Sequence, residues 1–157
     1  MTVQGAGGWL GKVVGTVVHG AGRGRGLGFP TANVAPDPAV PVPPAAIYAG
    51  LMARPAHGSL HPVTVSVGTN PTFCAGDEVH IEVYCHDLHD QLYGEQVVVW
   101  LVTRIRDTVR FGSVEALVAA AAQDVRTTAA TLTEEHRARA LAELCASPAR
   151  ETQQPAP

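Results

Sequence analysis

Glycine and proline divide the first two thirds of the chain into short segments, and this punctuation limits the fold more than any other feature. Runs rich in valine and isoleucine lie between the Gly and Pro clusters, at residues 12–18, 46–53, 62–68, 79–86 and 95–106. Such runs, bounded by turn residues, predict β-strands. The connections carry no helical pattern, so a parallel sheet of βαβ units fits poorly. The pattern predicts an antiparallel barrel or sandwich of five or six strands.

The last third of the chain changes character and predicts helices. From Ser113 onward the sequence is rich in Ala, Leu, Glu and Arg. Ser113 is suited to cap a helix over 114 to about 128, with Glu115 in the first turn where the helix dipole favours a negative charge. A second helix is expected after Thr133. We therefore expect one domain over residues 9–146, with flexible ends at 1–8 and 147–157.

Charge and hydropathy exclude several functional classes. The 157 residues contain 11 Lys and Arg against 14 Asp and Glu, a formal charge of -3, so no broad positive surface is expected for nucleic acid or an anionic membrane. The apolar runs are too short to cross a bilayer. We expect a cytoplasmic protein without an obligate protein partner. Three cysteines, Cys74, Cys85 and Cys145, are too few and too widely spaced for a disulfide framework or zinc finger and are interpreted as small buried residues.

The most unusual segment has glycine at every second position from 20 to 28. Gly20, Gly22, Gly24, Gly26 and Gly28 alternate with other residues that include Arg23 and Arg25. Exposed backbone N–H groups and two guanidinium groups suit a phosphate. The segment matches neither the P-loop nor the dinucleotide fingerprint, and a plain surface loop is the alternative.

The segment Pro30-Thr31-Ala32-Asn33 follows this loop directly. If the stretch is extended, Thr31 and Asn33 point to the same side. Two neutral oxygens suit Mg²⁺, which takes one or two protein ligands besides nucleotide phosphates and water. The alternative is an ordinary loop in which these side chains hydrogen-bond their own backbone.

The run at 79–86 alternates between apolar and polar residues. One face carries Val79, Ile81, Val83 and Cys85, and the other carries His80, Glu82, Tyr84 and His86. Glu82 is a candidate general base on the second face. A row of solvent-facing polar groups is the alternative. A metal site of His80, Glu82, His86 and His89 ranks below both, because the spacing matches no zinc motif.

Taken together, these segments resemble the riboflavin kinase family. The resemblance rests on Gly15-Thr16-Val17-Val18-His19-Gly20, on Leu27-Gly28-Phe29-Pro30-Thr31-Ala32-Asn33 and on Val67-Gly68-Thr69-Asn70-Pro71-Thr72, and it continues through Leu92-Tyr93-Gly94, Arg106 and Phe111-Gly112-Ser113. It implies a closed six-stranded antiparallel Greek-key barrel with C-terminal helices packed outside.

The resemblance also implies an activity, the transfer of a phosphoryl group from MgATP to riboflavin to give FMN and ADP. It assigns the ATP phosphates to Gly20, Gly22, Arg23, Gly24, Arg25 and Gly28, together with Thr31 and Asn33. It assigns Mg²⁺ to Thr31 and Asn33, the general base to Glu82, and the flavin to Arg106 and Phe111.

Several positions depart from the family pattern. Gly26 stands where Thr is common, Ala46 where Gly is usual, Tyr84 where His is common and Thr108 where an acidic residue is usual. A Cβ at Ala46 would clash if the backbone needed a positive φ. The family's adenylyltransferase domain has no counterpart before the first strand, so a stand-alone kinase that makes no FAD is expected. A non-catalytic flavin or nucleotide binder and a kinase for a modified flavin are the alternatives.

Overall fold

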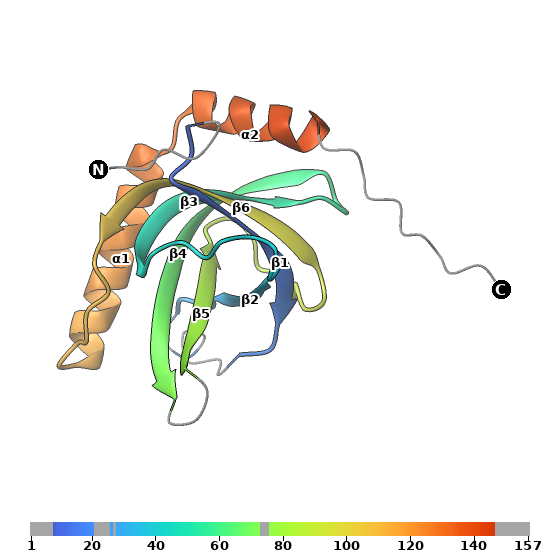
Figure 1. Ribbon diagram of the computed structural model, residues 1–157. Helices are drawn as coiled ribbons and strands as arrows, with labels where there is room; N and C mark the ends of the chain where they lie inside the picture. The colour runs from blue at the N-terminus through green and yellow to red at the C-terminus, as the bar shows by residue number, and fades with distance from the viewer. Residues whose placement is uncertain (1–7, 21–25, 27, 73–75, 147–157) are drawn as a thin grey trace.

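Six strands precede two helices along the chain (Figure 1). The computed structural model describes residues 8–20, 26, 28–72 and 76–146. The strands are β1 (Gly11–Val18), β2 (Ala32–Pro36), β3 (Ala46–Arg54), β4 (Ser59–Thr72), β5 (Gly76–Cys85) and β6 (Gln96–Arg106). The helices are α1 (Val114–Thr131) and α2 (Glu134–Ala146). The order of strands followed by helices agrees with the pattern of the sequence.

The strands close into a barrel in the order β1-β2-β5-β4-β3-β6. All six neighbouring pairs are antiparallel. β3, β4 and β5 are joined as successive hairpins, and β6 returns to lie beside β3, which is the Greek-key arrangement. The expected closed six-stranded barrel is therefore confirmed, and closure leaves no free sheet edge among the described strands.

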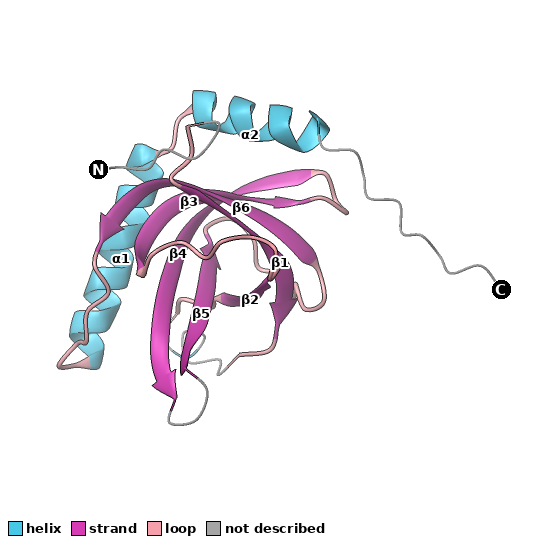
Figure 2. Ribbon diagram, in the orientation of Figure 1, coloured by secondary structure: helices cyan, strands magenta, loops and turns pink. Residues whose placement is uncertain are grey.

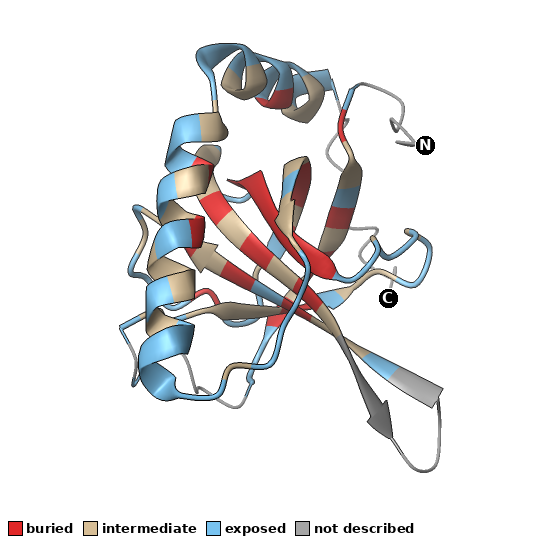
Figure 3. Cartoon of the chain, turned by 90° about the vertical axis from the view of Figure 1, so that its left-hand side faces the viewer, coloured by how far each residue is buried: buried red, intermediate tan, exposed pale blue. Residues whose placement is uncertain are grey.

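The interior of the barrel is filled by apolar side chains, which alternate with accessible ones along several strands. On β5, Ile81, Val83 and Cys85 are buried, whereas Glu82 between them is exposed. Buried and accessible positions alternate along several strands in the same way (Figure 3). Each valine fully removed from water contributes about 1.5–3 kcal/mol, so this inner face specifies the register of the sheet. The same alternation directs the polar side chains of β5 out of the core.

The two helices cover the outside of the barrel (Figure 2). α1 begins at Ser113, whose Oγ accepts a hydrogen bond from the Ala116 backbone N–H at 3.1 Å. It packs against β3, β4 and β6. α2 lies over a second apolar cluster, in which Trp9, Trp100 and Ala140 are buried. Among the described residues, no helix is both long and apolar enough to cross a bilayer.

The structure adds one strand and corrects one expectation about a cysteine. β2 was anticipated only as a possible extended stretch, because its single fully buried residue, Val34, gives no alternating pattern. Ala46 lies in the barrel core, and no described non-glycine residue has a positive φ, so the backbone condition for a clash of its Cβ is not met. Cys85 is buried as expected, but Cys145 is exposed. Cys74 lies outside the described residues.

Candidate active site

A cleft of about 920 Å³ runs over β2, β5 and β4. Residues from six separate segments line it, among them Gly20, Asn33, Ser66, His80, Glu82 and Thr108. Its volume far exceeds that of a second pocket, of about 90 Å³, in the described part of the molecule. Because the barrel topology brings these distant segments together, the cleft is the candidate active site.

Glu82 lies at the middle of a row of three oxygen-bearing residues. It is paired directly with Asn33 on β2 and with Ser66 on β4. Directly opposed residues of antiparallel strands have Cβ atoms about 4.5–5.5 Å apart. The register therefore brings a carboxylate, a carboxamide and a hydroxyl to one part of the cleft. Oxygen donors of this kind are those that a hard cation such as Mg²⁺ prefers, so the residues present fit that ion.

Gly20 lies against the Asn33 side chain. A Cβ built on Gly20 would overlap the carboxamide of Asn33 at its nitrogen and carbon atoms. Only a residue without a side chain leaves room for Asn33 at this point. The beginning of the glycine-rich loop and the end of the Pro-Thr-Ala-Asn segment thus meet at the wall of the cleft.

Thr31 and Asn33 lie at different hollows. Asn33 lines the large cleft, while Thr31 lines a smaller pocket of about 90 Å³ together with Val17, Asp90 and Tyr93. β2 begins at Ala32, so Thr31 stands just before the regular strand. Only Asn33 belongs to the extended strand, so the same-side orientation expected for a fully extended stretch stays a prediction. Their assignment to one Mg²⁺ stays a prediction.

The rest of the glycine-rich loop is described only in part. Gly26 and Gly28 are exposed, and Gly28 has a φ of 83°, which requires glycine at that turn. Nothing lies within 4 Å of a Cβ built on either residue. Gly22, Arg23, Gly24 and Arg25 lie outside the described residues, so their assignment to phosphate binding stays a prediction.

His80 lines the cleft, although the sequence pattern placed it only in the metal site ranked below the other interpretations. It lies two positions before Glu82 on the same face of β5 and lines the same cleft. Its Nε2 is shielded from solvent and has no hydrogen-bond partner, although the Glu78 carboxylate lies 3.8 Å away. No three His, Cys, Asp or Glu side chains gather as metal ligands within the described residues. The alternation of β5 placed His80 beside Glu82, but the orphaned nitrogen becomes visible only in the structure.

Arg106 and Phe111 are not among the residues that line the cleft, but they flank the lining residues 108–110 in the chain. The Arg106 guanidinium donates two hydrogen bonds to the Asp124 carboxylate of α1, at 2.9 and 2.7 Å. It also lies over the Phe111 ring, 5.5 Å from the ring centre. Asp124 is buried, so this pair fixes the end of β6 to α1. The flavin role assigned to both residues stays a prediction.

One of the positions that depart from the family pattern lines the cleft. Thr108 lines the cleft, next to the exposed Val109 and Arg110. Tyr84 packs edge-on against Phe29, with ring centres 5.5 Å apart. Gly26 has open space where a Cβ would stand. None of these departures disturbs the pairing of Glu82 with Asn33.

Comparison with known proteins agrees with this architecture. A protein-family model described as riboflavin kinase matches residues 9–132. The chain therefore belongs to the riboflavin kinase family, and the resemblance noted in the sequence is confirmed. α2 lies beyond the matched residues.

Two curated relatives and one solved structure show how the likeness is distributed. A bifunctional riboflavin kinase/FMN adenylyltransferase of Listeria monocytogenes is 36% identical over 116 residues, covering 74% of this chain and 36% of the relative. The RNA-binding riboflavin kinase RibR of Bacillus subtilis is 34% identical over 113 residues, covering 72% and 47%. The crystal structure of riboflavin kinase from Trypanosoma brucei has a TM-score of 0.60 at 26% identity, covering 87% and 89%. The chain thus spans between a third and a half of the two curated relatives.

Proposed function

We propose that this protein transfers the γ-phosphoryl group of MgATP to the 5′-hydroxyl of riboflavin, giving FMN and ADP. The single observation that carries the proposal is the direct pairing of Glu82 with Asn33 in a cleft that Gly20 also lines. Membership of the riboflavin kinase family supplies the substrates. The cleft supports the proposal because it brings a carboxylate and a carboxamide together.

Glu82 acts as the general base. Its carboxylate accepts the proton of the ribityl 5′-hydroxyl while that oxygen attacks the γ-phosphorus. The bond from the γ-phosphorus to the bridging oxygen breaks, and ADP leaves with the electron pair. Such transfers need little covalent work from the protein, so alignment and charge neutralisation supply most of the rate.

The other residues of the cleft orient the reactants. Asn33, with Thr31, would hold Mg²⁺, whose positive charge offsets that of the phosphates. Gly20 keeps the Asn33 carboxamide in place by leaving room for it. Backbone N–H groups of a glycine-rich segment suit the phosphate oxygens. Ser66, on the other side of Glu82, has a hydroxyl that can hydrogen-bond the carboxylate or the substrate.

The test is the formation of FMN from riboflavin, ATP and Mg²⁺, separated by chromatography. We expect activity in the wild type and a fall of about 10²–10⁴-fold in Glu82→Gln, which removes the base but keeps the shape. Glu135→Gln, an exposed site on α2 with the same change of charge, is the control and should keep full activity. A folded wild type that quenches riboflavin fluorescence but forms no FMN would overturn the kinase and leave a flavin-binding module.

A further inference from the structure

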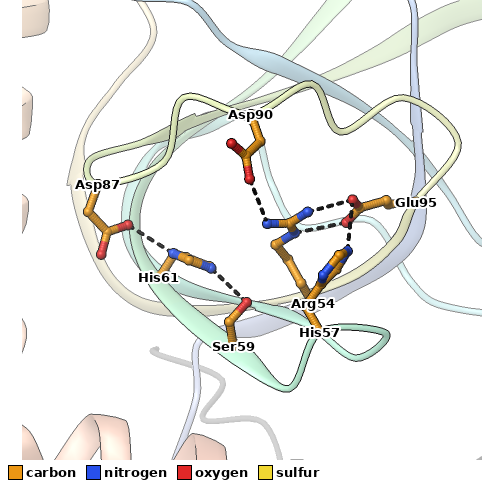
Figure 4. A network of polar contacts seen from close by, with 7 residues as sticks. All are labelled: Arg54, His57, Ser59, His61, Asp87, Asp90 and Glu95. Carbon is orange, nitrogen blue, oxygen red and sulfur yellow. Dashed lines mark hydrogen bonds and ion pairs between the residues drawn. The ribbon is translucent and has the colours of Figure 1, made fainter.

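Arg54, the last residue of β3, is a buried cation at the end of the barrel that carries the small pocket. Its side chain is only 7% exposed. The guanidinium donates from Nε and Nη2 to the two carboxylate oxygens of Glu95, at 2.9 and 2.6 Å. Nη1 donates to the carboxylate of Asp90 at 3.4 Å. Figure 4 shows the guanidinium between these two acids.

Both acids lie on the connection between β5 and β6, which we call the 86–95 connection. Asp90 lines the small pocket beside Thr31, as do His89 and Tyr93 of the same connection. Near its end, the Gly94 N–H donates to Val17 O at 2.8 Å, and the Val17 N–H donates to Glu95 O at 2.9 Å. Val17 precedes the glycine-rich loop by three residues. Glu95 therefore joins Arg54 on one side to the strand that leads into this loop on the other.

The hairpin between β3 and β4 also holds the beginning of the connection. His61 Nδ1 lies 2.9 Å from the carboxylate of Asp87, and its Nε2 lies 2.9 Å from Ser59 Oγ. His57 Nε2 lies 3.3 Å from Glu95. The connection is thus held near both ends and at its middle by side chains of one hairpin (Figure 4).

The aromatic contact between His19 and Tyr93 links this connection to the cleft. Their rings are stacked, with centres 3.8 Å apart. His19 lines the large cleft and Tyr93 lines the small pocket. A shift of the 86–95 connection would therefore move Tyr93 against His19, directly beside Gly20 and the Asn33 carboxamide.

The contacts of Arg54 can hold the 86–95 connection in one position. Two parallel hydrogen bonds from a guanidinium to a carboxylate set both distance and orientation. A lysine offers a single point charge and cannot reproduce that fork. Truncation of Arg54 would leave two carboxylates without their cation beneath the connection, so the connection would rearrange.

We infer that Arg54 is a positioning residue for the nucleotide: through Glu95 and Asp90 it fixes the 86–95 connection against the start of the glycine-rich loop. The inference rests on the proposed function for the identity of the ligand. It assigns to Arg54 an effect on the nucleotide side of the reaction and none on flavin binding.

The experiment compares Arg54→Met and Arg54→Lys with the wild type in two equilibrium titrations, one with MgADP and one with riboflavin. We expect the Kd for MgADP to rise by about 3- to 30-fold in Arg54→Met, and less in Arg54→Lys. The Kd for riboflavin should stay within about twofold. The KM for MgATP should change in parallel with the Kd for MgADP. Arg137→Met, which removes an arginine from α2, is the control and should change neither affinity.

Amide hydrogen exchange supplies a second readout that does not depend on activity. Exchange in the 86–95 connection should quicken in Arg54→Met while β3 and β4 stay protected. If Arg54→Met does not fold, the double variant Arg54→Met/Glu95→Leu removes the unpaired charge together with its partner and should show the same rise in the Kd for MgADP.

The outcomes separate this inference from the proposed function. Equal changes in both Kd values, or no change in either, in a protein that forms FMN would overturn the inference and leave the kinase intact. A wild type that binds MgADP, shows the selective loss in Arg54→Met and forms no FMN would support the positioning role and overturn the kinase. A wild type that does not bind MgADP would overturn both.

Discussion

Gly20 matters for the site because it has no side chain. The Asn33 carboxamide fills the space that a Cβ would need, so Gly20→Ala must displace that side chain. Misplacement of a ligand-holding group by about 1 Å can cost about 10²-fold in rate. We therefore expect FMN formation by Gly20→Ala to fall by about 10- to 100-fold, with the urea unfolding midpoint nearly unchanged because Gly20 is exposed.

Gly112→Ala is the matched control for this prediction. A Cβ on Gly112 meets nothing within 4 Å, so this variant should keep its activity. If Gly20→Ala kept wild-type activity, the position of the Asn33 carboxamide would be irrelevant to the reaction, and the role proposed for Asn33 would fall with it.

Single site residues could be predicted from the sequence where the residue type and its local pattern together indicate one chemical role. Glu82 and Asn33 could be selected from the alternation of a strand and from a short polar segment, and the structure pairs them. Ser66 could not be selected, because a lone serine in a strand carries no signal until the register of β4 against β5 is known. That Thr31 lines the smaller pocket and Asn33 the cleft also escaped prediction, since it depends on where β2 begins.

One carboxylate of α2, besides the apolar cluster beneath the helix, contacts two buried indoles. Glu143 accepts hydrogen bonds from the indole N–H groups of Trp9 and Trp100, at 2.6 and 2.9 Å, one at each oxygen. Both indoles are buried, with exposures of 3% and 1%. Since a buried donor without a partner costs about 1–3 kcal/mol, Glu143 stabilises the contact between α2 and the barrel.

The loss in the free energy of unfolding should therefore grow with the number of acceptors that a replacement of Glu143 removes. Glu143→Leu leaves both indole N–H groups without an acceptor, and we expect a loss of about 2–4 kcal/mol in the free energy of unfolding. Glu143→Gln keeps one acceptor and should lose about half as much. The measurement is urea unfolding followed by far-UV circular dichroism, with Glu135→Gln as a surface control that stays within about 0.5 kcal/mol of the wild type. Equal losses in Glu143→Gln and Glu135→Gln would contradict the two-indole contact.

At the scale of elements, five strands and both helices could be predicted, because each has an apolar face that leaves its period in the sequence. β2 has only one fully buried residue among five, so its pairing with β1 and β5 is what makes it a strand. Such an element is specified by its neighbours in the closed barrel. That is also why the cleft, whose wall includes β2, could not be derived from local pattern.

For the whole molecule, two groups favour the folded state less as the pH falls. Burial lowers the pKa of His86 below its ordinary 6.5, against the weaker opposing effect of Asp87. The hydrogen bond from Arg54 lowers the pKa of Glu95 below its ordinary 4.5. In each case the unfolded chain takes up a proton that the folded chain does not, so the free energy of unfolding falls with falling pH. The loss of stability caused by His86 sets in as the pH falls below about 6.5. The loss caused by Glu95 sets in below about pH 4.5.

Cys85 has the opposite effect on the alkaline side. Burial in the barrel core raises the pKa of its thiol from 9.0 to about 12. Between these values the unfolded chain loses a proton that the folded chain keeps. The free energy of unfolding therefore falls as the pH rises above 9, with a slope of up to about 1.4 kcal/mol per pH unit.

We thus expect the stability of the whole barrel to be greatest between about pH 7 and 9 and to fall on both sides. Urea unfolding at intervals from about pH 4 to 10 measures the profile, with the alkaline limit set to avoid titration of the buried Tyr48, whose pKa is raised above 10.0 by desolvation. His86→Asn should flatten the profile between about pH 7 and 5, and Cys85→Val should flatten it above pH 9, each without changing the opposite limb. An alkaline limb that stayed equally steep in Cys85→Val would show that another group causes it, and would contradict a protonated thiol in the core.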